Sequence, residues 1–307
     1  FNTILLGGWN NGGFDNYTLK YANDPDLGSE TELKDAIEKV HDVGGKIMFY
    51  VNALSISMDN DSYTGTGKDY AIEQINGETD CFGEFFLQHP MATLCNSVEA
   101  WRENIKRNIK YVLLELNADG IYLDQIGSAP RECYTENHIH DKPWSENYRI
   151  LLREIRQELK ELGKEDYVLL TEYPMDLYKD LIDCFLCYSF WQSANELCHP
   201  AMFRYVFPEV QLVDMVLQKP WLGRLQELEN EQALEIFCRQ FVNGVKYWTY
   251  CHAPNNEVLN EILDSVIELR KYGEEYFSEG KYLDDLNVQE KSAGILVKEY
   301  SIEEGKC

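Results

Sequence analysis

Two carboxylic acids, Asp124 and Glu172, have the residue type and the positions that most favour chemistry in this sequence. Asp124 directly follows the apolar run 120–123, and Glu172 closes the run 167–171. Cleavage of a glycosidic bond needs such a pair, because one carboxyl protonates the leaving oxygen while the other attacks the sugar carbon or activates water. A single acid at a strand end is more often a helix cap or an arginine partner. Two acids on consecutive strands favour a catalytic role.

Short apolar runs alternate with amphipathic stretches along nearly the whole chain, which predicts a parallel sheet covered by helices. Eight strands are expected, near residues 4, 48, 93, 121, 168, 186, 205 and 247. The third is Met91–Cys95 and the seventh is Phe203–Phe207. This α/β pattern has the size of a (β/α)8 TIM barrel. An open doubly wound sheet is the alternative, but no glycine-rich phosphate turn follows the first strand.

In such a barrel, catalytic groups stand at the carboxyl ends of the strands. Asp124 would end the fourth strand and Glu172 the fifth, so their side chains should converge at the barrel mouth. The first helix is expected to begin at Ser29, where Ser29 and Glu32 have the spacing of a capping box. We expect the barrel to occupy residues 1–280 of a longer protein. Residues 281–307 would begin a C-terminal β-rich extension.

The composition excludes several classes of protein. The chain has 307 residues, of which 44% are hydrophobic and 13% aromatic, so it is not a disordered chain. It carries 28 Lys and Arg against 53 Asp and Glu, a net charge of −25. Nucleic acids and anionic membranes both require a basic footprint, so we expect neither as a partner. No apolar run approaches the roughly 18 residues that a membrane helix needs.

Several residues near the expected strand ends could surround the two acids and contact a carbohydrate. Aromatic rings can stack on the apolar faces of sugars, although aromatic residues are also common in cores. A third carboxylate follows the expected seventh strand, where a capping role is equally plausible. The expected substrate-binding residues are Trp9, Asn52, Tyr122, Tyr173, Trp191 and Glu209.

Histidines and cysteines raise the question of a metal. His138 and His140 form a His-x-His pair with Cys133 nearby, a spacing that can bind zinc. The pair lies in the middle of a polar loop, so we expect it to be solvated or to contact substrate, with no metal and no other cofactor. Cys184 and Cys187 also have zinc-like spacing, but on a strand they would point to opposite faces. Nine scattered cysteines, an odd number, favour a reducing compartment and a cytoplasmic protein over a secreted one.

The segment Asp119-Gly-Ile-Tyr-Leu-Asp124-Gln-Ile-Gly127, with Glu172 after the next strand, resembles the retaining α-glycoside hydrolases built on (β/α)8 barrels. It is most similar to the endo-α-N-acetylgalactosaminidase and dextranase families. This resemblance implies that Asp124 is the nucleophile and Glu172 the acid/base, and that β-rich domains flank the barrel. Tyr122 stands where enzymes of the α-amylase type carry an arginine, which disfavours an α-amylase.

We therefore expect a retaining glycoside hydrolase that acts on an α-linked neutral sugar or oligosaccharide. Two alternatives remain open. One is a catalytically silent barrel that binds glycans. The other is a metal-dependent barrel hydrolase that uses His138 and His140.

Overall fold

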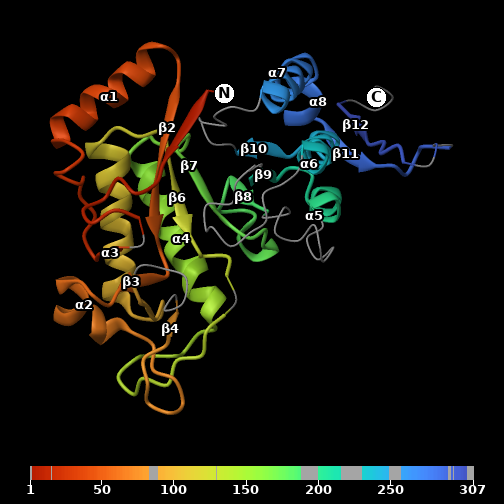
Figure 1. Ribbon diagram of the computed structural model, residues 1–307. Helices are drawn as coiled ribbons and strands as arrows, with labels where there is room; N and C mark the ends of the chain where they lie inside the picture. The colour runs from red at the N-terminus through yellow and green to blue at the C-terminus, as the bar shows by residue number, and fades with distance from the viewer. Residues whose placement is uncertain are drawn as a thin grey trace. The chain divides into compact units, whose positions relative to one another are not determined.

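A computed structural model describes residues 2–14, 16–82, 89–128, 130–187, 200–215, 230–248, 257–289, 292 and 294–302 (Figure 1). The chain divides into two compact units, Phe1–Asp183 and Cys184–Cys307. The elements of the first unit are β1 (Thr3–Leu6), α1 (Glu30–Asp42), β2 (Lys46–Asn52), β3 (Ser55–Ser57), α2 (Asp61–Gly65), η1 (Gly67–Tyr70), β4 (Cys81–Phe82), β5 (Met91–Thr93), α3 (Glu99–Lys110), η2 (Tyr111–Glu115), β6 (Gly120–Asp124), α4 (Trp144–Glu161), β7 (Val168–Glu172) and η3 (Asp176–Tyr178).

Four parallel strands form the centre of the first unit, in the order β1, β2, β6, β7. Every residue of β2 after Lys46 is buried, as is every residue of β6. Such continuous burial is expected where helices cover both faces of a parallel sheet, and it explains why these strands are continuous apolar runs. The register pairs Asn52 of β2 with Asp124 of β6, so these two side chains end neighbouring strands.

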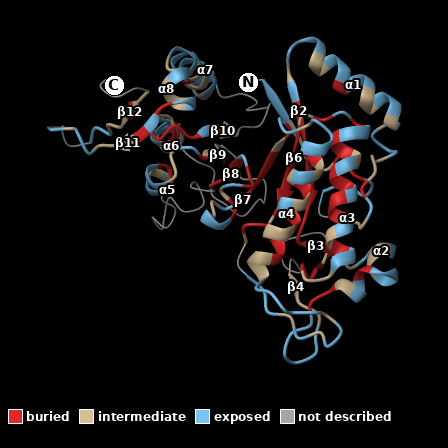
Figure 2. Cartoon of the chain, turned by 180° about the vertical axis from the view of Figure 1, so that it is seen from behind, coloured by how far each residue is buried: buried red, intermediate tan, exposed pale blue. Residues whose placement is uncertain are grey.

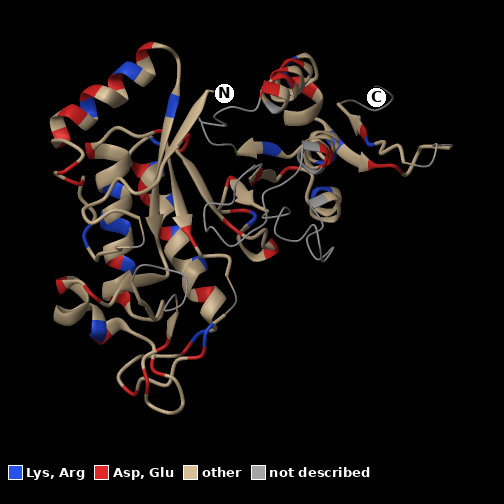
Figure 3. Cartoon of the chain, in the orientation of Figure 1, with Lys and Arg blue, Asp and Glu red and all other residues tan. Residues whose placement is uncertain are grey.

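Amphipathic helices cover these strands and keep their polar side chains outside. Figure 2 shows β2, β6 and β7 largely buried and much of the outer surface of α1, α3 and α4 exposed. The buried residues of α4 repeat at helical spacing, as Tyr148, Leu151, Leu152, Ile155 and Leu159. Figure 3 shows that acidic and basic residues alternate along α1, whereas the strands of this unit are largely uncharged. None of the helices in the described part of the chain is long and apolar enough to cross a membrane.

The strand expected at Met91–Cys95 exists, but it does not belong to the parallel sheet. It is β5, which pairs antiparallel with β3 and β4 in a separate three-stranded sheet. A parallel neighbour needs a crossover of a dozen or more residues, usually a full helix. Only the short α2 and η1 lie between β2 and β5. The third expected barrel strand is therefore wrong, and Asp124 and Glu172 end the third and fourth parallel strands in sequence order.

The second unit contains three further parallel strands, in the order β8, β9, β10. Its elements are β8 (Cys184–Leu186), α5 (Pro200–Val206), β9 (Gln211–Met215), α6 (Asn230–Val242), β10 (Lys246–Trp248), α7 (Glu257–Tyr272), α8 (Glu274–Ser278), β11 (Lys281–Asp284) and β12 (Glu299–Ser301). The last two strands form an antiparallel pair. The described residues thus hold seven parallel strands across the two units, one fewer than the eight of a (β/α)8 barrel. A complete barrel of eight strands stays a prediction.

The strand expected at Phe203–Phe207 is wrong, because these residues belong to α5 and the turn that follows it. The Phe207 N–H donates to the Phe203 carbonyl at 2.8 Å, a helical hydrogen bond. A short apolar run cannot be assigned to helix or strand from periodicity alone. Pro200 as the first helical residue was the signal for a helix start. The actual strand, β9, begins at Gln211.

The capping box at the start of α1 generates a stability prediction. The Glu32 N–H donates to Ser29 Oγ at 3.2 Å, and the Ser29 N–H donates to Glu32 Oε2 at 2.8 Å, which confirms the expected motif. Replacing Ser29 by Ala removes one acceptor and should lower the free energy of unfolding by about 1 kcal/mol. Urea denaturation followed by circular dichroism measures this loss. Ser29→Asp, which keeps an acceptor, should stay close to wild type. Equal loss in both variants would contradict the capping role.

Candidate active site

Asp124 and Glu172 are the last residues of the adjacent strands β6 and β7. They lie one position beyond the last paired residues of those strands, Leu123 and Thr171. The Thr171 hydroxyl donates to the Leu123 carbonyl at 2.6 Å and ties the two strand ends together. Both acids are buried, at 5% exposure for Asp124 and 7% for Glu172. The structure thus brings together the two residues that the sequence selected.

Side chains from β2 hold the Asp124 carboxyl. The Tyr50 hydroxyl donates to Asp124 Oδ2, and Asn52 Nδ2 donates to the same oxygen at 3.0 Å. The Tyr17 and Tyr50 hydroxyls lie 2.8 Å apart, which extends the network to the loop after β1. Donors aimed at a carboxylate favour its charged form and fix its position.

The surrounding backbone orients Asn52 in turn. Its Oδ1 accepts hydrogen bonds from the N–H groups of Leu54 at 2.9 Å and Ser55 at 2.7 Å. A carbonyl oxygen accepts these bonds, so the amide nitrogen must face the carboxyl of Asp124. The Asn52 N–H donates to the Tyr21 hydroxyl at 2.9 Å. Asn52 therefore lies at the end of β2 beside Asp124, with its amide held in one orientation.

The turns that follow the two acids are unusual. Gln125 and Tyr173, the residues directly after Asp124 and Glu172, have φ angles of 66° and 58°. This left-handed conformation is uncommon for residues other than glycine, and it persists where the surrounding structure holds it. A Cβ at Gly127 would lie 2.1 Å from the Glu172 carbonyl oxygen, so only glycine allows this approach. The turn after β6 is thus packed directly against the end of β7.

Burial and mutual repulsion control the charge of the two acids. Burial raises the pKa of Asp124 well above its usual value, and the charge of Glu172 raises this pKa further. The hydrogen bond from Tyr50 acts in the opposite direction. Two adjacent buried carboxyls cannot both ionise easily, so the pair retains one proton above the ordinary range of a carboxylic acid.

Two predicted tyrosines lie beside the acids. Tyr122 is buried on β6, and its ring centroid lies 5.4 Å from that of Tyr50. Tyr173 is 41% exposed. The pKa of Tyr173 is raised to about 12, first by burial and then by the charges of Glu172 and Asp124. Tyr173 therefore lies near both acids and still reaches solvent.

Trp9 occupies a different position from the one expected. It is only 5% exposed, and its indole N–H donates to the Tyr50 carbonyl at 2.8 Å. Its ring packs edge-on against Phe49, with centroids 4.9 Å apart. Trp9 thus supports the strand that carries Tyr50, and little of its ring is available to a sugar.

The remaining two predicted residues are not brought to this site by the described structure. Trp191 lies outside the described residues. Glu209 is exposed and lies in the turn between α5 and β9, before the start of that strand. Its expected position after a seventh strand depended on the wrong assignment of 203–207, so the placement of Glu209 at a strand's carboxyl end is wrong.

Tyr50 is the main residue that the sequence analysis missed. The only site residue expected from this strand was its last, Asn52, whereas Tyr50 lies two positions before the end of β2. Alternation along a strand places residues i and i+2 on one face, so Tyr50 shares the face of Asn52. A polar residue at this spacing inside an apolar strand was the available signal.

Comparisons with known proteins agree with this fold. The profile of a family described as "Domain of unknown function (DUF6259)" matches residues 3–213. A curated protein of Bacteroides thetaiotaomicron, named "Putative glycoside hydrolase", is 32% identical over 185 residues. That alignment covers 58% of this chain and 26% of the relative, so the chain matches about a quarter of that protein's length.

Solved structures of low sequence identity share the fold. The alpha-N-acetylgalactosaminidase NagBb from Bifidobacterium bifidum matches with a TM-score of 0.65 and 13% identity, over 92% of this chain and 44% of that chain. The maltogenic alpha-amylase AmyB from Thermotoga neapolitana matches with a TM-score of 0.63 and 15% identity, over 92% of this chain and 71% of that chain. At this identity the likeness establishes the fold alone.

The raised pKa of Asp124 predicts how stability depends on pH. A carboxyl group whose pKa is higher in the folded protein than in the unfolded chain contributes stability only at low pH. This contribution is complete below the unfolded pKa and is lost as the pH rises through the folded pKa. Asp124→Asn removes a group whose ionisation the folded state opposes, so it should raise the free energy of unfolding at pH 7 on the order of 1 kcal/mol. The gain should shrink toward pH 4. Urea denaturation at a series of pH values measures it.

Asp119, just before β6, offers a matched control of opposite sign. Despite partial burial its pKa is lowered, because Lys46, His41 and the Ile47 N–H hydrogen-bond to it. Asp119→Asn should therefore destabilise the protein at neutral pH, with a loss that shrinks as pH falls. If both variants were destabilised at pH 7, the proposed charge state of the active-site pair would be wrong.

Proposed function

We propose that this chain, which belongs to the DUF6259 family, is a glycoside hydrolase that cleaves an α-linked neutral sugar or oligosaccharide with retention of configuration. One observation carries the proposal. Two buried, electrostatically coupled carboxyl groups end adjacent parallel strands, and dedicated donors hold one of them. A double displacement at a sugar carbon requires such a pair of carboxyl groups.

The comparisons support the reaction class. The curated relative is named as a glycoside hydrolase, and both structural neighbours carry the names of carbohydrate-cleaving enzymes. The α linkage follows from the resemblance of the Asp119–Gly127 segment to retaining α-glycoside hydrolases. A neutral substrate suits a chain with a net charge of −25, because an anionic sugar would be repelled by the acidic protein and by the two carboxyl groups.

In the proposed mechanism, Asp124 attacks the sugar carbon and Glu172 protonates the departing oxygen. Tyr50 and Asn52 donate to Asp124 and favour its charged form, against the burial and the Glu172 charge that raise its pKa. In the proposed mechanism, the proton that the pair retains lies on Glu172. A covalent ester forms between Asp124 and the sugar as the glycosidic bond breaks. Glu172, now a carboxylate, takes a proton from water, which attacks the ester and restores Asp124.

Tyr173 is the described aromatic residue best placed to meet substrate, because it is exposed and lies near both acids. Trp191 remains a proposed substrate contact. A barrel that occupies residues 1–280, followed by a β-rich extension, also remains part of the proposal, as does a cytoplasmic location.

Two substitutions separate the roles of the acids. Asp124→Ala should abolish turnover of every aryl α-glycoside, because no glycosyl-enzyme can form. Glu172→Ala should slow substrates with poor leaving groups about 10²- to 10⁴-fold, the usual contribution of a general acid. The Glu172→Ala variant should still form the glycosyl-enzyme from nitrophenyl glycosides at a normal rate. Added azide should partly restore the breakdown of the glycosyl-enzyme. Steady-state kinetics over a leaving-group series measure both effects.

Glu38→Ala, which removes an exposed acid on α1, serves as the control and should leave the rates unchanged. Equal loss for all leaving groups in Glu172→Ala, with no azide rescue, would overturn the acid/base assignment. Full binding of a glycan by a wild-type protein with no turnover would favour the silent glycan-binding barrel.

Tyr50→Phe tests the donor to the proposed nucleophile. A hydrogen bond to a charged group contributes about 1.5–3 kcal/mol, so kcat/KM should fall roughly tenfold to hundredfold. Loss of this donor raises the pKa of Asp124 further, so the acidic limb of the pH–kcat/KM profile should move to higher pH. Tyr17→Phe, which alters only the next hydroxyl in the network, should have a smaller effect. An unmoved acidic limb in Tyr50→Phe would contradict this role.

A further inference from the structure

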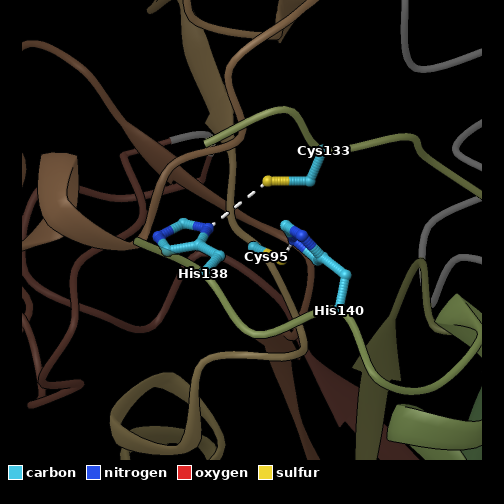
Figure 4. A group of neighbouring side chains, drawn as sticks. All are labelled: Cys95, Cys133, His138 and His140. Atoms are coloured by element: carbon cyan, nitrogen blue, oxygen red, sulfur yellow. Dashed lines mark hydrogen bonds between the residues drawn. The ribbon is translucent and has the colours of Figure 1, made fainter. Parts of the chain in front are cut away.

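Four side chains that can bind a metal converge in the first unit, and the proposed hydrolytic mechanism uses none of them. Cys95 directly follows the small antiparallel sheet, and Cys133, His138 and His140 belong to the long loop between β6 and α4. One ligand atom from each lies within 4.8 Å of the others. Figure 4 shows the four side chains pointing into one shared space. Cys95 is buried, and neither cysteine forms a disulfide.

The separations match those of a tetrahedral zinc site. With Zn–S near 2.3 Å and Zn–N near 2.0–2.1 Å, tetrahedral geometry places sulfur and nitrogen ligands about 3.5 Å apart. Cys133 Sγ lies 3.3 Å from His138 Nδ1, and Cys95 Sγ lies 3.6 Å from His140 Nε2. Each cysteine sulfur thus lies at about the distance from one histidine nitrogen that two ligands of the same zinc ion have.

The tautomer of His138 is set for metal binding. Its Nε2 lies 2.9 Å from the Asp69 carbonyl oxygen, which can only accept a hydrogen bond, so Nε2 carries the proton. The neutral ring therefore presents the lone pair of Nδ1 to the cluster. A second ring nitrogen that donates to a backbone carbonyl is the usual support of a metal-binding histidine.

Hydrogen bonds to the segment 69–73 hold the ligand-bearing residues in place. The Cys95 N–H donates to the Tyr70 carbonyl at 2.7 Å. The Thr135 hydroxyl donates to the Ala71 carbonyl at 3.2 Å and accepts the Glu73 N–H at 3.0 Å. The loop that carries three of the ligands is thus attached to the segment that orients the fourth.

We propose that Cys95, Cys133, His138 and His140 bind one zinc ion in a tetrahedral Cys2His2 site. Thiolate and imidazole ligands in this geometry select zinc over the hard cations calcium and magnesium. Four protein ligands leave no open position, so the ion is structural and takes no part in hydrolysis. Zinc attaches the loop that begins after Asp124 to the small sheet, and so stabilises one border of the acid pair.

The test begins with the metal content of the unmodified chain. The 307-residue protein, prepared in reducing buffer without a polyhistidine tag from zinc-supplemented culture, should contain about one zinc per chain by elemental mass spectrometry. Replacement of zinc by cobalt should give the visible absorption of a tetrahedral complex together with a thiolate charge-transfer band. Removal of zinc by a chelator should lower the melting temperature and expose loop 130–143 to protease.

Four variants assign the ligands. Cys95→Ser, Cys133→Ser, His138→Ala and His140→Ala should each lose most of the zinc. Cys238→Ser and His89→Ala, which alter a cysteine and a histidine outside the cluster, should retain it. Circular dichroism identifies any variant that fails to fold, and the wild-type stoichiometry and cobalt spectrum test the site without any substitution.

Three results would overturn the proposal. They are a wild-type protein without zinc after reduction and reconstitution, a cobalt complex without the thiolate band, and a Cys95–Cys133 disulfide in the reduced preparation. If the Cys95→Ser variant and the Cys133→Ser variant each retained zinc, the proposed ligand set would also be refuted. The outcome does not depend on the hydrolase activity, so the two proposals fail separately.

Discussion

The repulsion between two carboxyl groups in a buried position is the constraint around which the first unit is organised. Burying a charge without a partner is costly, and a second acid beside it increases the cost. The structure meets this cost with oriented donors, Tyr50 and Asn52, which hold Asp124 from the neighbouring strand. Trp9 in turn donates to the carbonyl of Tyr50 and packs behind it. Trp9, which was expected to contact a sugar, thus supports the residue that holds Asp124.

Features that depend on local sequence were predictable. Six of the seven parallel strands in the described residues, the long helices and the capping box at Ser29 follow from apolar runs, helical spacing and end residues. The convergence of Asp124 and Glu172 was also predictable, because neighbouring parallel strands bring their carboxyl ends to one edge. Each of these inferences needed only the order of elements and the rule for that element.

Features that depend on contacts distant in sequence were not predictable. The run at Met91–Cys95 has the composition of a strand, but its partners decide whether it joins the parallel sheet, and β3 and β4 pair with it instead. The Phe203–Phe207 error then misplaced Glu209. The cysteine pair with zinc-like spacing in the sequence, Cys184 and Cys187, lies in a buried strand and just beyond it. The four residues that do converge are spread from position 95 to position 140.

The close approach of Gly127 to the Glu172 carbonyl fixes the start of the long connection between β6 and α4. A side chain on residue 127 would push the ends of β6 and β7 apart. Beyond this turn the loop to α4 is held by other contacts, because the Thr135 hydroxyl donates to the Ala71 carbonyl and accepts the Glu73 N–H. Any change in the length of this loop would therefore have to keep both the turn at Gly127 and the contacts of Thr135 in place.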